Sequence, residues 1–76
     1  MKLQIFGSGC QKCDLLAQHT EIAVRDLGID YTIEKVSDMN AIIDAGVMRT
    51  PALRVNGRIV VEGAVPSAEK IKTLLV

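Results

Sequence analysis

Cys10 and Cys13 are the two cysteines of this 76-residue chain, and two residues separate them. A pair with this spacing can form a reversible disulfide, or it can offer two thiolates to a soft metal ion. As a structural crosslink the pair is weak, because such a short loop stabilises a fold by only ~2 kcal/mol when the entropy of the unfolded chain is considered. The spacing therefore indicates redox chemistry or metal binding.

The surroundings of the two cysteines predict different roles for them. We expect Cys10 at the N-terminus of a helix, where unpaired N–H groups and the helix macrodipole stabilise a thiolate. Lys12 adds a positive charge nearby, and such surroundings lower the pKa of a cysteine from ~8.5 toward 7 or below. Cys13 falls on the apolar stripe of the same helix. Cys10 is thus the predicted nucleophile, and Cys13 is the predicted resolving thiol.

The hydrophobic pattern predicts one α/β domain over residues 1–76, with the cysteines between its first strand and first helix. Leu3 to Phe6 indicates a buried strand that ends at glycines, and apolar residues spaced by three and four indicate a helix from Cys13 to Leu27. The later predicted elements are a strand over Asp30–Val36, a helix from Met39 to Ala45, a hairpin of strands Ala52–Val55 and Arg58–Glu62 around Asn56-Gly57, and a helix opened by Pro66-Ser67. The order βαβαββα predicts a four-stranded mixed sheet flanked by helices.

Composition and charge exclude several classes of protein. Nine basic residues balance nine acidic residues, so the net basic surface of a nucleic-acid-binding or membrane-surface protein is not expected. No apolar run is long enough for a membrane span, and we expect no signal peptide. A secreted protein of this size usually has four to eight cysteines in a disulfide framework. We therefore expect a cytoplasmic protein, and we also expect it to be a monomer.

Metal binding is the main alternative to redox chemistry. Small metallochaperone domains also place a CxxC pair after their first strand, but their order is βαββαβ, and they commonly have Met where this chain has Ser8. A closed zinc site needs about four ligands, and His19 is the only histidine that can join the two cysteines. We expect no resident metal site, while delivery of a soft metal ion stays open, as does a redox fold used only for protein interaction.

Other polar and sulfur-containing residues give weaker signals. His19 lies off the apolar stripe and is expected to be a solvated surface side chain. The same expectation holds for the arginines of the second half of the chain, Arg49, Arg54 and Arg58. Met39 and Met48 are expected to fill the core or line a groove.

The element order, the Cys10-Gln11-Lys12-Cys13 motif and the segment Val47–Leu53 together resemble the thioredoxin/glutaredoxin superfamily, and above all its small redox-active disulfide proteins. The resemblance covers the whole chain and implies a minimal thioredoxin fold. It also implies a cis peptide bond between Thr50 and Pro51, facing the cysteines. The Thr50 backbone would pair with an extended substrate segment in a groove that Gly63 borders.

This resemblance implies a thiol–disulfide oxidoreductase without a cofactor, which cycles a Cys10–Cys13 disulfide and dithiol with client disulfide proteins. Glutaredoxins commonly have a Gly-Gly followed by an acidic pair for glutathione, where this chain has Gly63-Ala64. A flavoenzyme similar to thioredoxin reductase is therefore the expected electron donor, in preference to glutathione. Thioredoxins have a buried acidic proton acceptor at the position of Gln4, which cannot titrate. The sequence identifies no replacement.

Overall fold

The elements of the chain follow the predicted order in a computed structural model that describes residues 1–7 and 11–75. They are β1 (Lys2–Phe6), α1 (Gln11–Leu27), β2 (Thr32–Val36), α2 (Met39–Asp44), β3 (Ala52–Val55), β4 (Arg58–Glu62) and α3 (Ala68–Leu75). The strands form one sheet in the order β2-β1-β3-β4, with β1 parallel to β2 and the other neighbours antiparallel. The prediction of a minimal thioredoxin fold is confirmed.

Strand β2 begins two residues later than the alternating pattern predicted. Its first residue, Thr32, pairs with Lys2, the first residue of β1. The Thr32 N–H donates to the Met1 carbonyl oxygen at 2.9 Å, and the amino group of Met1 donates to the Asp30 carbonyl oxygen at 2.9 Å. The start of β2 is thus set by where its partner strand begins.

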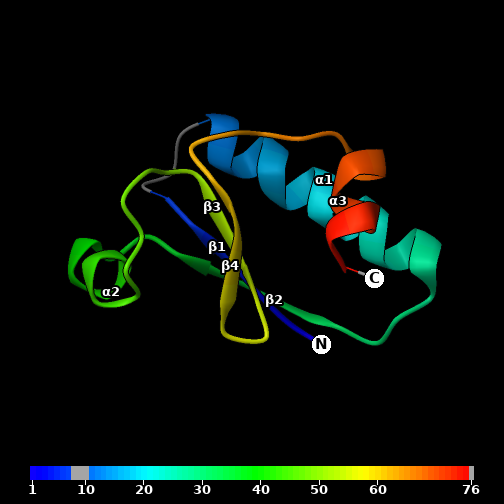
Figure 1. The fold of residues 1–76 in the computed structure, drawn as a ribbon, viewed down its shortest axis with the longest axis horizontal. Coiled ribbons are helices and arrows are strands. Elements are labelled where there is room, and N and C mark those ends of the chain that lie inside the picture. The colour runs from blue at the N-terminus through cyan, green and yellow to red at the C-terminus, as the bar shows by residue number, and fades with distance from the viewer. Residues whose placement is uncertain (8–10, 76) are drawn as a thin grey trace.

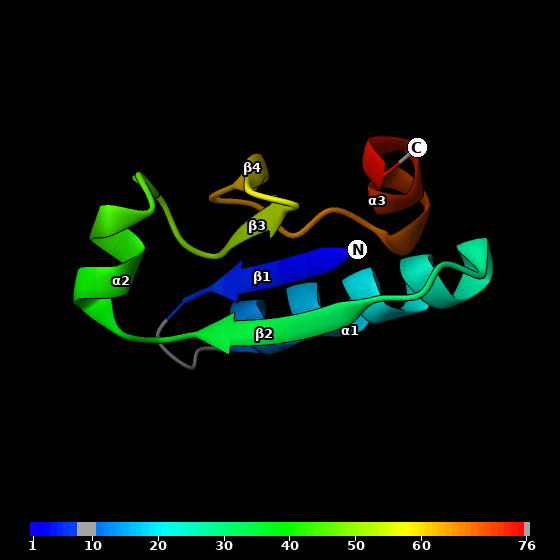
Figure 2. The ribbon, with the colours of Figure 1, turned by 90° about the horizontal axis from the view of Figure 1, so that it is seen from below.

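The two faces of the sheet bury different side chains because residues alternate along β1. Leu3 and Ile5 belong to a core that includes Leu16 of α1 and Ile71 of α3. Phe6 belongs to a second cluster with three further buried residues, Ile42, Val47 and Ala52. Figure 1 shows α1 and α3 beside each other, and Figure 2 shows α1 running along the sheet while α2 stands at the end where β1 and β2 finish.

Local signals at the turns and helix ends behave as the sequence predicted. Asn56 and Gly57 both adopt positive φ angles, 50° and 87°, which a two-residue hairpin turn of this kind requires. The Asp38 carboxylate accepts from the Asn40 N–H at 3.3 Å and caps α2, and the Ser67 hydroxyl oxygen accepts from an N–H in the first turn of α3. Among the helices described, none is long and apolar enough to cross a membrane.

Candidate active site around Cys13

Cys13 lies in the first turn of α1, on the helix face that packs against the sheet. Its residue surface is 6% exposed, and it continues the buried stripe that includes Leu16 and Ala17. Lys12, beside it, is exposed. Cys10, the predicted nucleophile, lies outside the described residues.

Gly7 forms the opposite wall of the Cys13 site. Its N–H donates to the Val36 carbonyl oxygen at 3.0 Å, which holds the end of β1 against β2. A Cβ atom at this position would collide with Cys13 Sγ and would lie 3.2 Å from Cys13 Cβ. The absence of a side chain at Gly7 is thus what allows the sulfur to pack against the end of β1. The sequence indicated only a turn here, and a turn glycine gives no signal of such a contact.

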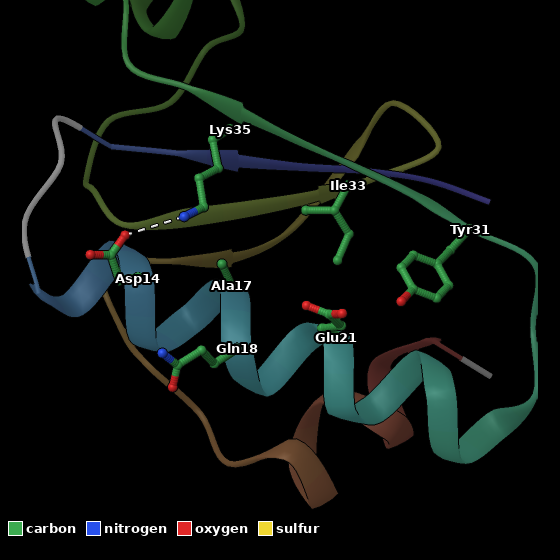
Figure 3. Close-up of a pocket in the computed structure, with 7 residues that line it drawn as sticks. All are labelled: Asp14, Ala17, Gln18, Glu21, Tyr31, Ile33 and Lys35. Atoms are coloured by element: carbon green, nitrogen blue, oxygen red, sulfur yellow. Dashed lines mark hydrogen bonds and ion pairs between the residues drawn. The ribbon is translucent and has the colours of Figure 1, made fainter.

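A cavity of about 200 Å³ reaches Cys13, and its lining comes from three stretches of the chain. The lining residues are Ile5, Gly7, Cys13, Asp14, Lys35 and Ser37. Lys35 Nζ lies 3.3 Å from Asp14 Oδ1 and joins the edge strand β2 to the first turn of α1. Figure 3 shows this ion pair at one end of a shallow polar groove between α1 and β2. Sequence reasoning missed both residues, because they are 21 positions apart and meet only when the helix lies on the sheet.

The predicted substrate-groove residues lie close together at the start of β3. The peptide bond between Thr50 and Pro51 is cis, as the resemblance implied. Thr50 is exposed, Pro51 is buried, and the Gly63 N–H donates to the Pro51 carbonyl oxygen at 2.9 Å. Thr50 also lines an apolar groove whose other walls come from α2 and the segment after it: Met39, Ile42, Ile43, Val47 and Met48.

Glu62, at the end of β4, holds the segment that precedes Thr50. Its Oε2 accepts hydrogen bonds from the backbone N–H of Met48 at 2.6 Å and of Arg49 at 3.3 Å. The next residue, Gly63, has a φ of 70°, and a Cβ there would lie 3.0 Å from Arg49 Cβ. The residues at the end of β4 thus fix the backbone of the segment that leads into Thr50. A single Glu at a strand end carries no sequence signal for such a role.

Gln4 lies on the sheet face opposite to the Cys13 site, and its side chain bridges three strands. Its Nε2 donates to Glu34 Oε1 at 3.0 Å, and its Oε1 accepts from Arg54 Nε at 2.6 Å. The Arg54 guanidinium also lies 5.0 Å from the centre of the Phe6 ring, within the range of a cation–π contact. The prediction that Arg54 is a solvated side chain is therefore wrong, because a buried amide and an aromatic ring hold it.

His19 is also more engaged than predicted. It is half-buried, and its Nδ1 donates to the Pro66 carbonyl oxygen at 2.9 Å, because the loop that leads to α3 passes beside α1. The expectation of a freely solvated histidine is wrong. Within the described ranges, no group of three or more His, Cys, Asp or Glu side chains is arranged to hold a metal ion.

Fold and site together define a small α/β protein with a buried thiol at the junction of its first strand and first helix. A sequence profile of the thioredoxin domain matches residues 1–76. A thioredoxin from Methanothermobacter thermautotrophicus is 43% identical over 75 residues, covering 99% of this chain and 97% of that protein. A thioredoxin from Methanocaldococcus jannaschii is 44% identical over 70 residues, covering 92% of this chain and 80% of that protein. The chain belongs to the thioredoxin family, and it is a thiol–disulfide oxidoreductase.

Proposed function

We propose that the protein reduces client disulfides by cycling Cys10 and Cys13 between a dithiol and a disulfide. The observation that carries this proposal is the packing of Cys13 against Gly7, in the first turn of α1, in a chain of the thioredoxin family. A buried thiol at this place is protected from solution reagents, yet it is three residues from Cys10. That arrangement suits a resolving thiol, whose target is the neighbouring sulfur.

The proposed cycle has two thiol–disulfide exchange steps. The Cys10 thiolate attacks one sulfur of the client disulfide, a Cys10–client disulfide forms, and the first client sulfur leaves as a thiolate. The Cys13 thiolate then attacks the Cys10 sulfur, the Cys10–Cys13 disulfide forms, and the second client sulfur leaves. Two electrons pass from the protein to the client.

The segment around Thr50 is the proposed substrate groove. Thr50 is exposed beside the buried Pro51, so that its backbone can pair with an extended client segment, and Gly63 borders the same place. Glu62 holds the backbone before Thr50 and acts as a positioning residue. Lys12, exposed in the first turn of α1, adds a positive charge that favours the Cys10 thiolate.

The proposed partners are client disulfide proteins and a flavoenzyme similar to thioredoxin reductase. The lack of a Gly-Gly and acidic pair after β4, where Gly63 is followed by Ala64, supports that donor over glutathione. The profile match over residues 1–76 supports a single domain. Two cysteines in place of a disulfide framework, and a balanced charge, support a cytoplasmic protein without nucleic-acid or membrane partners. A monomer is part of the same proposal.

Trapping of mixed disulfides tests this proposal. Cys13→Ser should accumulate a covalent adduct with a disulfide-bonded test protein such as insulin, because Cys10 still attacks but nothing resolves the product. Cys10→Ser should form no adduct, and the double variant serves as the blank. Intact mass measured without reductant reads the result. Equal adduct formation by both single variants would contradict the assigned roles.

A further inference from the structure

Resolution of a mixed disulfide requires that Cys13 lose its proton, and burial opposes this. A thiolate in apolar surroundings is disfavoured unless a positive charge or a hydrogen-bond donor compensates it. Cys13 is 6% exposed, and Ile5 is among its cavity neighbours. Gln4 cannot accept a proton, and its amide is engaged with Glu34 and Arg54 on the other face of the sheet. A positive charge that favours the thiolate can come from another element that borders the same cavity.

The register of the sheet places one positively charged side chain, Lys35, on the face that borders the Cys13 cavity. Lys35 pairs with Ile5 in the parallel ladder, and both residues line the cavity that reaches Cys13. Its neighbour Glu34 pairs with Gln4 and lies on the opposite face, since side chains alternate along a strand. Figure 3 shows Lys35 extending from β2 toward α1, on the same side as Ile33 and Tyr31. A shift of the β1–β2 register by one residue would place the Glu34 carboxylate on the cavity face instead of the Lys35 ammonium group.

Among the described residues that line the cavity, the charged groups are Asp14 from α1 and Lys35 from β2. Strand β1 contributes Ile5, the residue after it contributes Gly7, and the segment after β2 contributes the Ser37 hydroxyl, none of which titrates in the working pH range. The side chains of Lys35 and Asp14 are 62% and 60% exposed, so the pair borders the cavity and is also open to solvent. An exposed pair of this kind adds little to stability. Its position beside a buried thiol suits it to influence the ionisation of that thiol.

We propose that Lys35, paired with Asp14, is the positioning residue that stabilises the Cys13 thiolate as it forms. This inference rests on the proposed role of Cys13 as the resolving thiol. The Cys13 S–H bond breaks, and the proton passes to solvent water through the cavity. The electron pair forms the bond to Cys10 Sγ, and the Cys10–client bond breaks with its electron pair on the client sulfur, so that no further oxidant or reductant is needed.

The two charges of the pair have opposite effects on Cys13, which gives a test by sign. An ammonium group near a thiol favours the thiolate, and a carboxylate disfavours it. Lys35→Met should raise the pKa of Cys13 by about one unit, which is a tenfold loss of thiolate at a pH below that pKa. Lys35→Arg keeps the charge and should restore the wild-type value. Asp14→Asn removes the opposing charge and should lower the pKa.

The experiment follows the ¹³Cβ chemical shift of Cys13 against pH in a Cys10→Ser background, where Cys13 is the one remaining thiol. Lys72→Met is the matched control, because Lys72 also forms ion pairs, with Asp26 and Glu69, away from the Cys13 cavity. It should leave the titration of Cys13 unchanged. Far-UV circular dichroism of each variant checks that the fold is retained, as the exposure of Lys35 and Asp14 leads us to expect.

Three results would overturn the proposal: no shift in Lys35→Met, the same shift in Lys35→Arg as in Lys35→Met, or a raised pKa in Asp14→Asn. The last would be opposite in sign to the direct effect of a carboxylate on a nearby thiol. Because the titration involves neither client nor Cys10, it is separate from the trapping experiment. A Lys35-dependent pKa without trapped adducts would reject the redox cycle alone, and trapped adducts without a Lys35-dependent pKa would reject this inference alone.

Discussion

The two faces of the sheet carry polar side chains in opposite ways. On the face away from α1, Gln4 is 8% exposed and both ends of its amide are hydrogen-bonded, to Glu34 and Arg54 in the adjacent strands. On the α1 face, Lys35 and Asp14 pair in the open, 62% and 60% exposed, beside a buried cysteine. The first set of polar groups is satisfied within the fold. The second set, the Lys35–Asp14 pair, places exposed charges next to Cys13, whose thiol must ionise.

This difference separates structural from chemical use of polar residues in a very small protein. A buried side chain needs hydrogen-bond partners, and no buried side-chain nitrogen or oxygen in the described part of the chain lacks one. An exposed ion pair adds little to stability, so its position can instead serve the electrostatic effect of its charges on a neighbouring group. We therefore expect changes on the Gln4 face to alter stability, and changes of the Lys35 pair to alter the thiol.

Gly7→Ala should produce the largest effect, because it affects the packing at the sulfur itself. The added Cβ would collide with Cys13 Sγ, and overpacking of this kind costs ~1–3 kcal/mol of unfolding free energy. Gly7 is not among the glycines with positive φ, so the backbone itself tolerates alanine. Urea unfolding at neutral pH measures the loss.

Cys13→Ala provides the control for that substitution. It removes the sulfur, so Gly7→Ala should cost much less in the Cys13→Ala background than in the wild type. An equal cost in both backgrounds would show that the Gly7–Cys13 contact is not the cause.

Gln4→Leu should test the structural face. Leucine removes both hydrogen bonds and leaves Glu34 and Arg54 without their shared partner, at an expected cost of about 1–2 kcal/mol. The pKa of Cys13 should stay at the wild-type value, since the change lies on the other face of the sheet. Urea unfolding and the Cys13 titration are measured on the same variant. A large change in the titration with little change in stability would reverse the comparison.

Glu62→Ala should affect client reduction more than stability. The carboxylate is exposed, yet it holds the Met48 and Arg49 N–H groups ahead of Thr50. Its loss should lower the rate of client reduction several-fold and reduce the unfolding free energy by about 1 kcal/mol. Glu69→Ala, an exposed glutamate on α3, is the matched control. An unchanged rate in Glu62→Ala would remove Glu62 from the proposed groove.

Lys72→Met should have the smallest effect on stability, because the ion pairs of Lys72 are exposed. A hydrogen bond to Asp26 raises the pKa of Lys72 above its ordinary 10.5. The contribution of Lys72 to the unfolding free energy is therefore fully present below pH 10.5. It is lost as the pH rises through the higher pKa of the folded state. Lys72→Met should leave the urea midpoint within error at pH 7, and any difference from the wild type should shrink further at pH 11. A large loss at pH 7 would contradict this view of exposed pairs.

The pattern of the sequence predicted those features that depend on neighbours along the chain. The α1 stripe follows from a three–four spacing, and the hairpin follows from Asn56-Gly57, since both are local. Nothing in the pattern indicated that Lys35 would border the Cys13 cavity. The pattern also cannot predict the partner of Lys35, because the Asp14 contact depends on how α1 is rotated over β2.

The missed and mistaken residues share one physical cause, which is contact across long separations in the chain. Arg54 was expected in solvent but binds Gln4, 50 positions away, and His19 bonds the Pro66 carbonyl, 47 positions away. Gly7 matters because Cys13 packs on it once the helix docks. Each of these contacts needs the sheet register and the helix packing, which no local signal specifies.

Equilibration of the wild-type protein with thiol redox buffers tests the central claim most directly. We predict one two-electron transition between a dithiol and an intramolecular Cys10–Cys13 disulfide, with a tenfold change in the ratio for each ~30 mV. Its midpoint should fall between roughly −270 and −120 mV, the range spanned by redox-active proteins of this kind. Acid-quenched mass spectrometry of the alkylated protein measures the two forms. Absence of an intramolecular disulfide at every potential tested would contradict the account.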